Sequence, residues 1–455
     1  MSATIERDLD VRRSVARDAS GLELVPDGVA RPASEAEVVE LLRRATAERT
    51  PVTPAGSQTS TTGASITDRG LLLSLAGMAR VLDVDPAART VRVEPGVRLG
   101  ELKRALAPHG LMFAPDPTSE EDSTVGGAIA CNASGARTLR YGATREHVLG
   151  VRVALASGEV VELARTALEK NTVGYALVHD PVDWFVGSEG TLGVVVAATL
   201  RLLPRPERVI GLGIPFASER EALAFVVAAR ESARVKARCL EYFDALALAI
   251  AREAHGGAWA EGAAAFVYAE DAGHADEELP LEEWIALGES HGAMVDDVLV
   301  FEGEAALRDA RRMRHAIPAT MNERGASHRA AGGRKLSTDW AVPYRQLDRM
   351  IADARALADA AGIEQAVIYG HAGNGHPHQN FIARDAAERE RIEAVIGATL
   401  ERVLAMGGTV AAEHGIGKIK RRWLPLQLSP LQLGVMQAVK RELDPHGLLS
   451  PGNVV

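Results

Sequence analysis

Cysteines and long apolar runs are scarce in this sequence. Cys131 and Cys239 are the only thiols in 455 residues, which excludes a disulfide framework and predicts a reducing compartment. The longest apolar run, residues 192–203, is interrupted by Arg201, well short of the roughly 20 residues of a membrane span. The first 20 residues lack the apolar core of a secretory signal. These absences predict a cytoplasmic protein with no transmembrane segment, and peripheral attachment to a membrane stays open.

Basic tracts are also lacking. The net charge is -10, from 51 Lys and Arg against 61 Asp and Glu, so nothing marks a surface for nucleic acid. Hydrophobic residues make up 47%, enough for a large core. Because single cores stop growing near about 250–300 residues, the chain is expected to form two or three domains.

The two commonest phosphate-binding motifs are missing as well. No GxGxxG follows a strand, and 413-EHGIGKIK-420 lacks the first glycine and the Ser/Thr of a GxxxxGK[ST] loop. Two loops of small residues are present instead, at 54–63 and 123–142. Such loops let backbone N–H groups approach a pyrophosphate, although each alone could be a tight turn between strands. Their presence together, beside 187-GSEGTLGVV-195, favours a nucleotide site.

Periodicity divides the chain into a strand-rich half and a helix-rich half. Short strands are predicted at 71–75, 81–85 and 90–96, and residues 148–163 are predicted to form two strands joined by a Ser-Gly turn. Helices are predicted at 34–48, 218–231, 345–362 and 388–408. A strand at 366–371 leads into a histidine-rich segment between the last two helices. This alternation predicts an α+β second domain with helices on one face of a sheet, beginning near the prolines at 204–206.

That segment, 370-GHAGNGHPHQNF-381, has a counterpart in 412-AEHGIGKIK-420. His371 and His378 stand seven residues apart across a glycine turn, which can aim both imidazoles at one point. Two histidines and one carboxylate, supplied by Glu413, are a common ligand set for a catalytic divalent metal. His414 would then serve as a base. The alternative is that these histidines only make hydrogen bonds within their loops.

The motifs PAGSQTSTTGAS, PDPTSEEDSTVGGAIACNASG, RYGATREHVLGVRVALASGEVV, VGSEGTLGVV, IYGHAGNGHPHQNF, AEHGIGKIK and LDPHGLLSPGNVV occur in this order over nearly the whole chain. They resemble the D-2-hydroxyacid dehydrogenase branch of the vanillyl-alcohol oxidase / p-cresol methylhydroxylase flavoproteins. The resemblance implies an α+β fold: a two-subdomain FAD-binding domain at 1–207, a ferredoxin-like substrate (cap) domain at 208–410, and a C-terminal segment, 411–455, returning to the FAD domain.

The resemblance also implies a set of FAD-binding residues. The first loop would hold the pyrophosphate, the second would line the flavin, Val194 would lie on the adenine side, and the C-terminal Asn453 would return to the flavin. Ser57 and Gln58 stand where some relatives carry a histidine bonded to FAD, which implies non-covalent FAD. The full expected set is Pro54, Ala55, Gly56, Ser57, Gln58, Thr59, Gly63, Pro117, Thr124, Gly126, Gly127, Ala130, Asn132, Ser134, Gly135, Val194 and Asn453.

For the metal, the family pattern GHxGDGNxH…EHGxG implies that His371, His378 and Glu413 bind Zn or Mn and that His414 is the catalytic base. The sequence departs from the pattern at Asn374, where Asp is frequent, and at His376, where Asn is frequent. His376 is therefore either another ligand or a neighbour of the ligands.

Arg314 resembles the family arginine that binds the substrate carboxylate, and Lys335 is a second expected anchor. Ser337 stands where hydroxyglutarate-type relatives have a lysine, which favours a D-lactate-like monocarboxylate over glycolate or D-2-hydroxyglutarate. The expected partners are this 2-hydroxyacid and an electron acceptor (quinone, cytochrome or electron-transfer flavoprotein), and a homodimer is left open. A non-flavin metallohydrolase is the alternative from another class.

Overall fold

The computed structural model describes residues 4–256 and 259–455, which divide into two compact units. The first unit comprises residues 1–135, 142–205 and 413–455, and the second comprises 136–141 and 206–412. The chain therefore passes into the second unit for six residues, 136–141, near the end of the predicted flavin segment 123–142. No helix in the described ranges combines the length and the apolar character needed to cross a bilayer.

The first unit contains two main sheets, with strand orders β1-β2-β4-β3 and β5-β6-β10-β8-β9. Its strands are β1 (Ile5–Glu6), β2 (Gly28–Ala30), β3 (Val52–Ala55), β4 (Leu71–Ser74), β5 (Val81–Asp85), β6 (Thr90–Val93), β7 (Leu111–Met112), β8 (Val148–Ala154), β9 (Val160–Ala164), β10 (Val194–Arg201) and β11 (Leu203–Pro204). Its helices are α1 (Leu9–Ser14), α2 (Glu35–Glu48), α3 (Leu99–Leu106), α4 (Val125–Cys131), α6 (Thr144–His147), α7 (Val182–Phe185), α14 (Leu424–Gln427) and α15 (Pro430–Leu443).

Helix α2 forms where the sequence predicts it. The side chain of Ser34 caps it by accepting the N–H of Glu37, and Val38, Leu41 and Leu42 bury its apolar face. The end of the chain pairs with β3, because the Ser450 N–H donates to the Val52 carbonyl at 2.8 Å. The C-terminal residues thus lie beside the strand that leads into the first small-residue loop.

The second unit is built on a seven-stranded antiparallel sheet of order β15-β12-β14-β13-β17-β18-β16. The strands are β12 (Arg208–Phe216), β13 (Cys239–Asp244), β14 (Ala265–Gly273), β15 (Leu299–Glu302), β16 (Gly332–Ser337), β17 (Val367–His371) and β18 (His376–Asp385). The helices are α5 (Thr138–Tyr141), α8 (Glu219–Glu231), α9 (Ala245–His255), α10 (Leu281–Glu289), α11 (Gly303–Ala326), α12 (Leu347–Ala360) and α13 (Ala386–Ala405).

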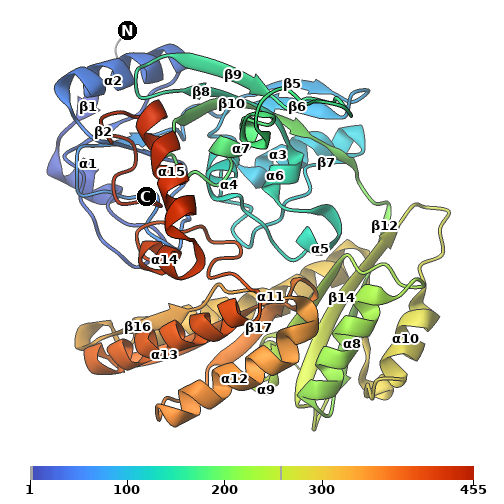
Figure 1. Ribbon diagram of the computed structural model, residues 1–455. Helices are drawn as coiled ribbons and strands as arrows, with labels where there is room; N and C mark the ends of the chain where they lie inside the picture. Colours follow the sequence, from blue (N-terminus) through green and yellow to red (C-terminus); the bar gives the residue numbers. More distant parts are fainter. Residues whose placement is uncertain (1–3, 257–258) are drawn as a thin grey trace. The chain divides into compact units, whose positions relative to one another are not determined.

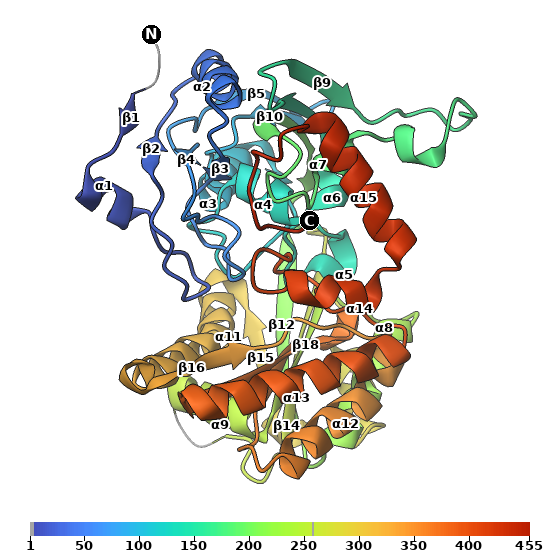
Figure 2. The same ribbon diagram turned by 60° about the vertical axis from the view of Figure 1, so that its left-hand side comes forward.

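Helices cover both faces of this sheet, so the prediction of helices on one face is wrong. Helices α9 and α11 pack with Phe266 and Tyr369, whose side chains share one face. Helices α12 and α13 pack with Phe381 of β18, which points to the other face. Figure 1 shows α8 beside α10, and Figure 2 shows α12 beside α13. The sequence shows little sign of a helix on the second face, because residues 303–326 are mostly polar. Met313, Ile317 and Met321 nevertheless form a buried stripe on α11.

Candidate functional site

Three histidines meet on a β-hairpin of the second unit. His371 ends β17, and His376 and His378 lie on β18, on the other side of a turn at Ala372–Asn374. The register pairs His371 with His376, and alternation along β18 puts His378 on the same face. The ring centroids are 5.5 Å apart for His371 and His376, 5.4 Å for His371 and His378, and 4.7 Å for His376 and His378.

The hairpin turn depends on Gly375. This residue has φ +68°, and a Cβ there would clash with the carbonyl oxygen of Val342. The tight turn therefore pairs β17 with β18 directly, and it sets the register that places His371 opposite His376. All three imidazoles are buried.

A buried carboxylate holds both His371 and Arg314. Glu241 Oε1 lies 2.5 Å from His371 Nδ1, and Glu241 Oε2 accepts the Nε–H of Arg314 at 2.8 Å. Burial raises the pKa of Glu241, but the charges and hydrogen bonds of His371 and Arg314 outweigh it and bring the pKa to about 2. The Arg314 guanidinium also stacks on the Tyr369 ring, 4.7 Å from its centroid.

The contact with Glu241 sets the tautomer of His371. With Nδ1–H donated to the carboxylate, Nε2 carries the lone pair that a metal would use. Sequence reasoning missed Glu241, although an acidic residue inside the apolar strand 239-CLEYFD-244 is itself a signal of a buried polar partner.

His376 has a carboxylate at one ring nitrogen too. Its Nε2 lies 3.2 Å from Asp339 Oδ1, although this buried nitrogen makes no well-aligned hydrogen bond within the described residues. The backbone of Asp339 also accepts the N–H of Ala412 at 2.8 Å, and its Oδ2 lies 3.2 Å from the same nitrogen. Asp339 thus ties the strand with His376 to the residue before Glu413, and the sequence prediction did not include it.

Lys335 lies on β16 opposite Ile382, whose side chain shares the histidine face of the sheet. Its Nζ donates to Asn322 Oδ1 at 3.0 Å. Burial, with a smaller effect from the charge of Arg314, lowers the pKa of Lys335 to about 8. Lys335 therefore lies on the face that carries the imidazoles, and Arg314 of α11 contacts that face through Glu241 and Tyr369.

The first unit brings the two small-residue loops together. Strand β3 ends at Ala55, and a Cβ on the next residue, Gly56, would clash with the hydroxyl of Thr124. That hydroxyl accepts the N–H of Gly127 at 3.2 Å and so caps α4. The backbones of the loops approach as closely as a pyrophosphate cradle requires, which fits the expected FAD site. Val194, by contrast, has its side chain in the apolar core.

Asn453 and Lys418 close the first loop from the C-terminal side. Asn453 Nδ2 donates to the Ala64 carbonyl at 2.8 Å, and Lys418 Nζ donates to Asn453 Oδ1 at 2.7 Å and to the Gly63 carbonyl at 3.1 Å. Burial lowers the pKa of Lys418 to about 8. The sequence prediction named Asn453 and Gly63 but missed the lysine that joins them.

The loop that carries His414 is fixed to the same region of the first unit. Thr62 Oγ1 donates to the His414 carbonyl at 3.4 Å. Glu189 accepts the N–H groups of Ile416 at 2.5 Å and Gly417 at 2.7 Å. Burial raises the pKa of Glu189, although these two N–H groups oppose the rise. Glu189 lies in a motif that the sequence singled out, yet its own role was not predicted.

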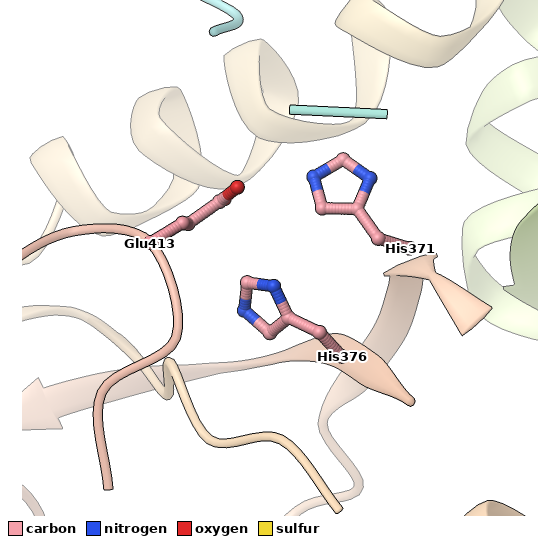
Figure 3. A group of neighbouring side chains, drawn as sticks. All are labelled: His371, His376 and Glu413. Carbon is pink, nitrogen blue, oxygen red and sulfur yellow. The ribbon is translucent and has the colours of Figure 1, made fainter. Parts of the chain in front are cut away.

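Figure 3 draws His371 and His376 together with Glu413, which begins the last segment of the first unit. Glu413 follows Ala412 directly, so the Asp339 contact described above lies one peptide bond away. Two imidazoles with a carboxylate at one ring nitrogen are the usual arrangement of histidines that bind metal. The residues therefore fit a divalent metal on the histidine face of the sheet.

Two family models match the sequence. The model described as "FAD binding domain" matches residues 26–164, and the model described as "FAD linked oxidases, C-terminal domain" matches residues 205–454. Together they span most of both units. They show a flavoprotein oxidoreductase, and they count against the metallohydrolase alternative.

Relatives with assigned names match over most of their length. The glycolate oxidase subunit GlcD of Bacillus subtilis is 32% identical over 437 residues, covering 94% of this chain and 89% of the relative. D-2-hydroxyglutarate dehydrogenase of Xanthomonas citri pv. viticola is 32% identical over 444 residues, with the same coverage. D-lactate dehydrogenase of Archaeoglobus fulgidus is 32% identical over 431 residues, covering 94% and 91%.

Among solved structures, an alkyldihydroxyacetonephosphate synthase superposes with a TM-score of 0.73 at 17% sequence identity. The match covers 98% of this chain and 82% of the other. At this identity the likeness shows the fold alone, and it confirms the predicted fold class, a two-domain FAD-binding oxidase of the vanillyl-alcohol oxidase type.

Proposed function

Because the chain belongs to the family of FAD-linked oxidases, we propose that it oxidises a D-2-hydroxyacid to the 2-oxoacid with FAD and a divalent metal. The observation that carries the proposal is the face of the second sheet that bears three imidazoles and Lys335 and is contacted by Arg314 of α11 through Glu241 and Tyr369. Imidazoles suit a metal that chelates a hydroxyl and a carboxylate, and the two cations suit the substrate's carboxylate.

Each group has a definite task in this reaction. His371, His378 and Glu413 hold the metal, which when bound lowers the pKa of the substrate hydroxyl. Arg314 donates to the substrate carboxylate, with its plane fixed by Tyr369 and its Nε held by Glu241. His414 accepts the hydroxyl proton, since an imidazole with a pKa near ~6.5 suits a base at neutral pH.

The small-residue loops of the first unit would hold FAD, which when bound would supply the two-electron acceptor for the α-hydrogen as hydride. The substrate thus loses one proton to His414 and one hydride, and it becomes the 2-oxoacid. The two electrons then pass to an acceptor such as a quinone, a cytochrome or an electron-transfer flavoprotein. The hydrogen bond that Thr62 donates and those that Glu189 accepts support this scheme, because they hold the His414 loop beside the loop that would bind FAD.

For the substrate we propose a D-lactate-like monocarboxylate, since Ser337 replaces the lysine expected of hydroxyglutarate-type relatives. A D-2-hydroxyglutarate or glycolate activity is the second candidate. The observation that favours the dicarboxylate is Lys335, whose strand position puts it on the same face as the histidines. Arg314 and Lys335 could then each take one carboxylate.

The test is anaerobic bleaching of the flavin absorbance by D-lactate, L-lactate, glycolate and D-2-hydroxyglutarate, each before and after EDTA treatment. We expect D-lactate to bleach the flavin fastest, L-lactate to fail, and EDTA to abolish bleaching. Faster bleaching by D-2-hydroxyglutarate would replace the proposed substrate and keep the mechanism. A holoenzyme that no hydroxyacid reduces would remove the proposed reaction, and full activity after complete metal removal would remove the metal from it.

A further inference from the structure

His376 lies inside the imidazole cluster rather than beside it. The β17–β18 register puts it directly across from His371, and its side chain is buried with a relative exposure of 4%. Its ring is 4.7 Å from that of His378, which is closer than either ring lies to His371. An imidazole buried against two others needs a reason, because three such rings repel one another whenever more than one is protonated.

The surroundings of His376 repeat those of His371. In each residue one ring nitrogen lies against a buried carboxylate, Glu241 for His371 Nδ1 and Asp339 for His376 Nε2. Figure 3 shows the other nitrogen of each ring, Nε2 of His371 and Nδ1 of His376, facing the space between the two side chains. A carboxylate on one nitrogen, with the other nitrogen turned toward the neighbouring ligand, is what orients a histidine toward a metal.

A purely structural histidine would be satisfied differently. It would make well-aligned hydrogen bonds, because an unpaired buried nitrogen is costly. Within the described residues, His376 Nε2 makes none, although Asp339 Oδ1 is only 3.2 Å away. The ring therefore lies against Asp339 without a well-aligned hydrogen bond, and a bound cation would strengthen this contact by making Nε2–H a stronger donor.

We propose that His376 is itself a metal ligand, binding through Nδ1, so that the metal of the proposed function is held by three imidazoles. This inference rests on that proposed function for the presence of a metal. The inference goes beyond the proposed function because the ligand set taken from the family resemblance contains only two histidines, His371 and His378. The chain would thus bind its metal with more nitrogen and less oxygen than the family pattern implies.

The chemical consequence is metal choice. Imidazole suits Zn²⁺, Fe²⁺ and Co²⁺, whereas carboxylate and water suit Mn²⁺. A third imidazole should therefore make this protein prefer Zn²⁺ or Co²⁺ over Mn²⁺ by a wider margin than a site with two.

The experiment compares the holoprotein with His376→Asn, and with His291→Asn as a matched control at a partly buried histidine outside the cluster. Zn²⁺ affinity is measured by chelator competition, and the Co²⁺-loaded proteins are compared by visible absorption. We expect His376→Asn to bind Zn²⁺ on the order of 100-fold more weakly and to change the Co²⁺ spectrum, because losing a direct ligand costs at least as much as losing its supporting partner. The control should match the wild type.

Unchanged Zn²⁺ affinity and an unchanged Co²⁺ spectrum in His376→Asn would overturn the inference and leave the proposed function intact. A wild-type protein that binds no divalent metal would instead overturn the metal in the proposed function, and this inference with it. If His376→Asn does not fold, X-ray absorption of Zn-loaded wild type decides: three imidazoles per zinc support the inference, and two overturn it.

Discussion

Arg137 and Glu270 form a bidentate ion pair, in which Arg137 Nε lies 2.9 Å from Glu270 Oε2 and Arg137 Nη2 lies 3.0 Å from Glu270 Oε1. Glu270 lies on β14 and also accepts from the Tyr268 hydroxyl at 3.0 Å. Arg137 belongs to the six residues, 136–141, that the second unit takes from near the end of the predicted flavin segment. The residues just before it, Ser134 and Gly135, are expected FAD contacts, so this pair fixes the end of the flavin segment on the second sheet.

Replacing Arg137 should therefore affect both stability and FAD retention. In Arg137→Met the Glu270 carboxylate stays buried without its main partner, which costs about 3–5 kcal/mol for a buried pair. The midpoint of thermal unfolding should fall by roughly 6–15 °C and FAD should dissociate more easily, as measured by flavin fluorescence during heating. Arg312→Gln, which removes an exposed ion pair with Asp309, is the control and should change little. Equal melting of the two variants would contradict this role.

Glu241→Gln tests the carboxylate shared by His371 and Arg314. The amide keeps the shape but loses the charge, so His371 is oriented less well and Arg314 loses its counter-ion. We expect metal affinity to fall about 10–100-fold and KM for the hydroxyacid to rise. Chelator competition and steady-state kinetics measure the two effects separately, and Glu302→Gln on the exposed edge strand β15 is the control. Metal affinity equal to wild type would show that Glu241 only packs the core.

Lys335 predicts a pH dependence of substrate binding. Its pKa is lowered to about 8, so the ammonium is present below that pH and is lost as the pH rises through it. If Lys335 holds a substrate carboxylate, KM should rise between pH 7 and pH 9, approaching tenfold per pH unit at the upper end. Lys335→Arg should keep KM low at pH 9, and Lys335→Met should show a high KM at both pH values. A flat KM in the wild type would exclude this contact.

His414→Gln tests the proposed base. Turnover should fall by about 10²–10⁴-fold, because a positioned general base contributes that much, while FAD and metal contents stay at wild-type levels. His446→Gln changes an exposed histidine of the same unit and should leave turnover unchanged. Stopped-flow reduction of the flavin measures the step directly. A reduction rate in His414→Gln within twofold of wild type would remove His414 as the base.

Much of the secondary structure could be predicted from the sequence because local patterns were strong. The Ser34–Glu37 spacing and the stripe of Val38, Leu41 and Leu42 predict α2, and the structure confirms it. The helices predicted at 345–362 and 388–408 appear as α12 and α13, each slightly shorter or shifted. No helix is predicted at 303–326, where α11 forms, since a few buried residues among many charges give a weak periodic signal.

The residues around the candidate site could be predicted only in part. His371, His376 and His378 are close in sequence, so a glycine turn was enough to suggest that they meet. Glu241 and Asp339 carried no comparable signal, because their partners His371 and His376 lie far along the chain on other strands of the sheet.

The sequence by itself determined the residue types and the order of the motifs, and hence the flavoprotein family and the chemistry to expect. The tertiary structure alone decided which atoms face each other. Hairpin register at Gly375 placed His376 opposite His371, and strand pairing of β13 with β17 brought Glu241 to His371 from 130 residues away. Such contacts depend on the register and faces of a seven-stranded sheet, which local sequence patterns do not specify.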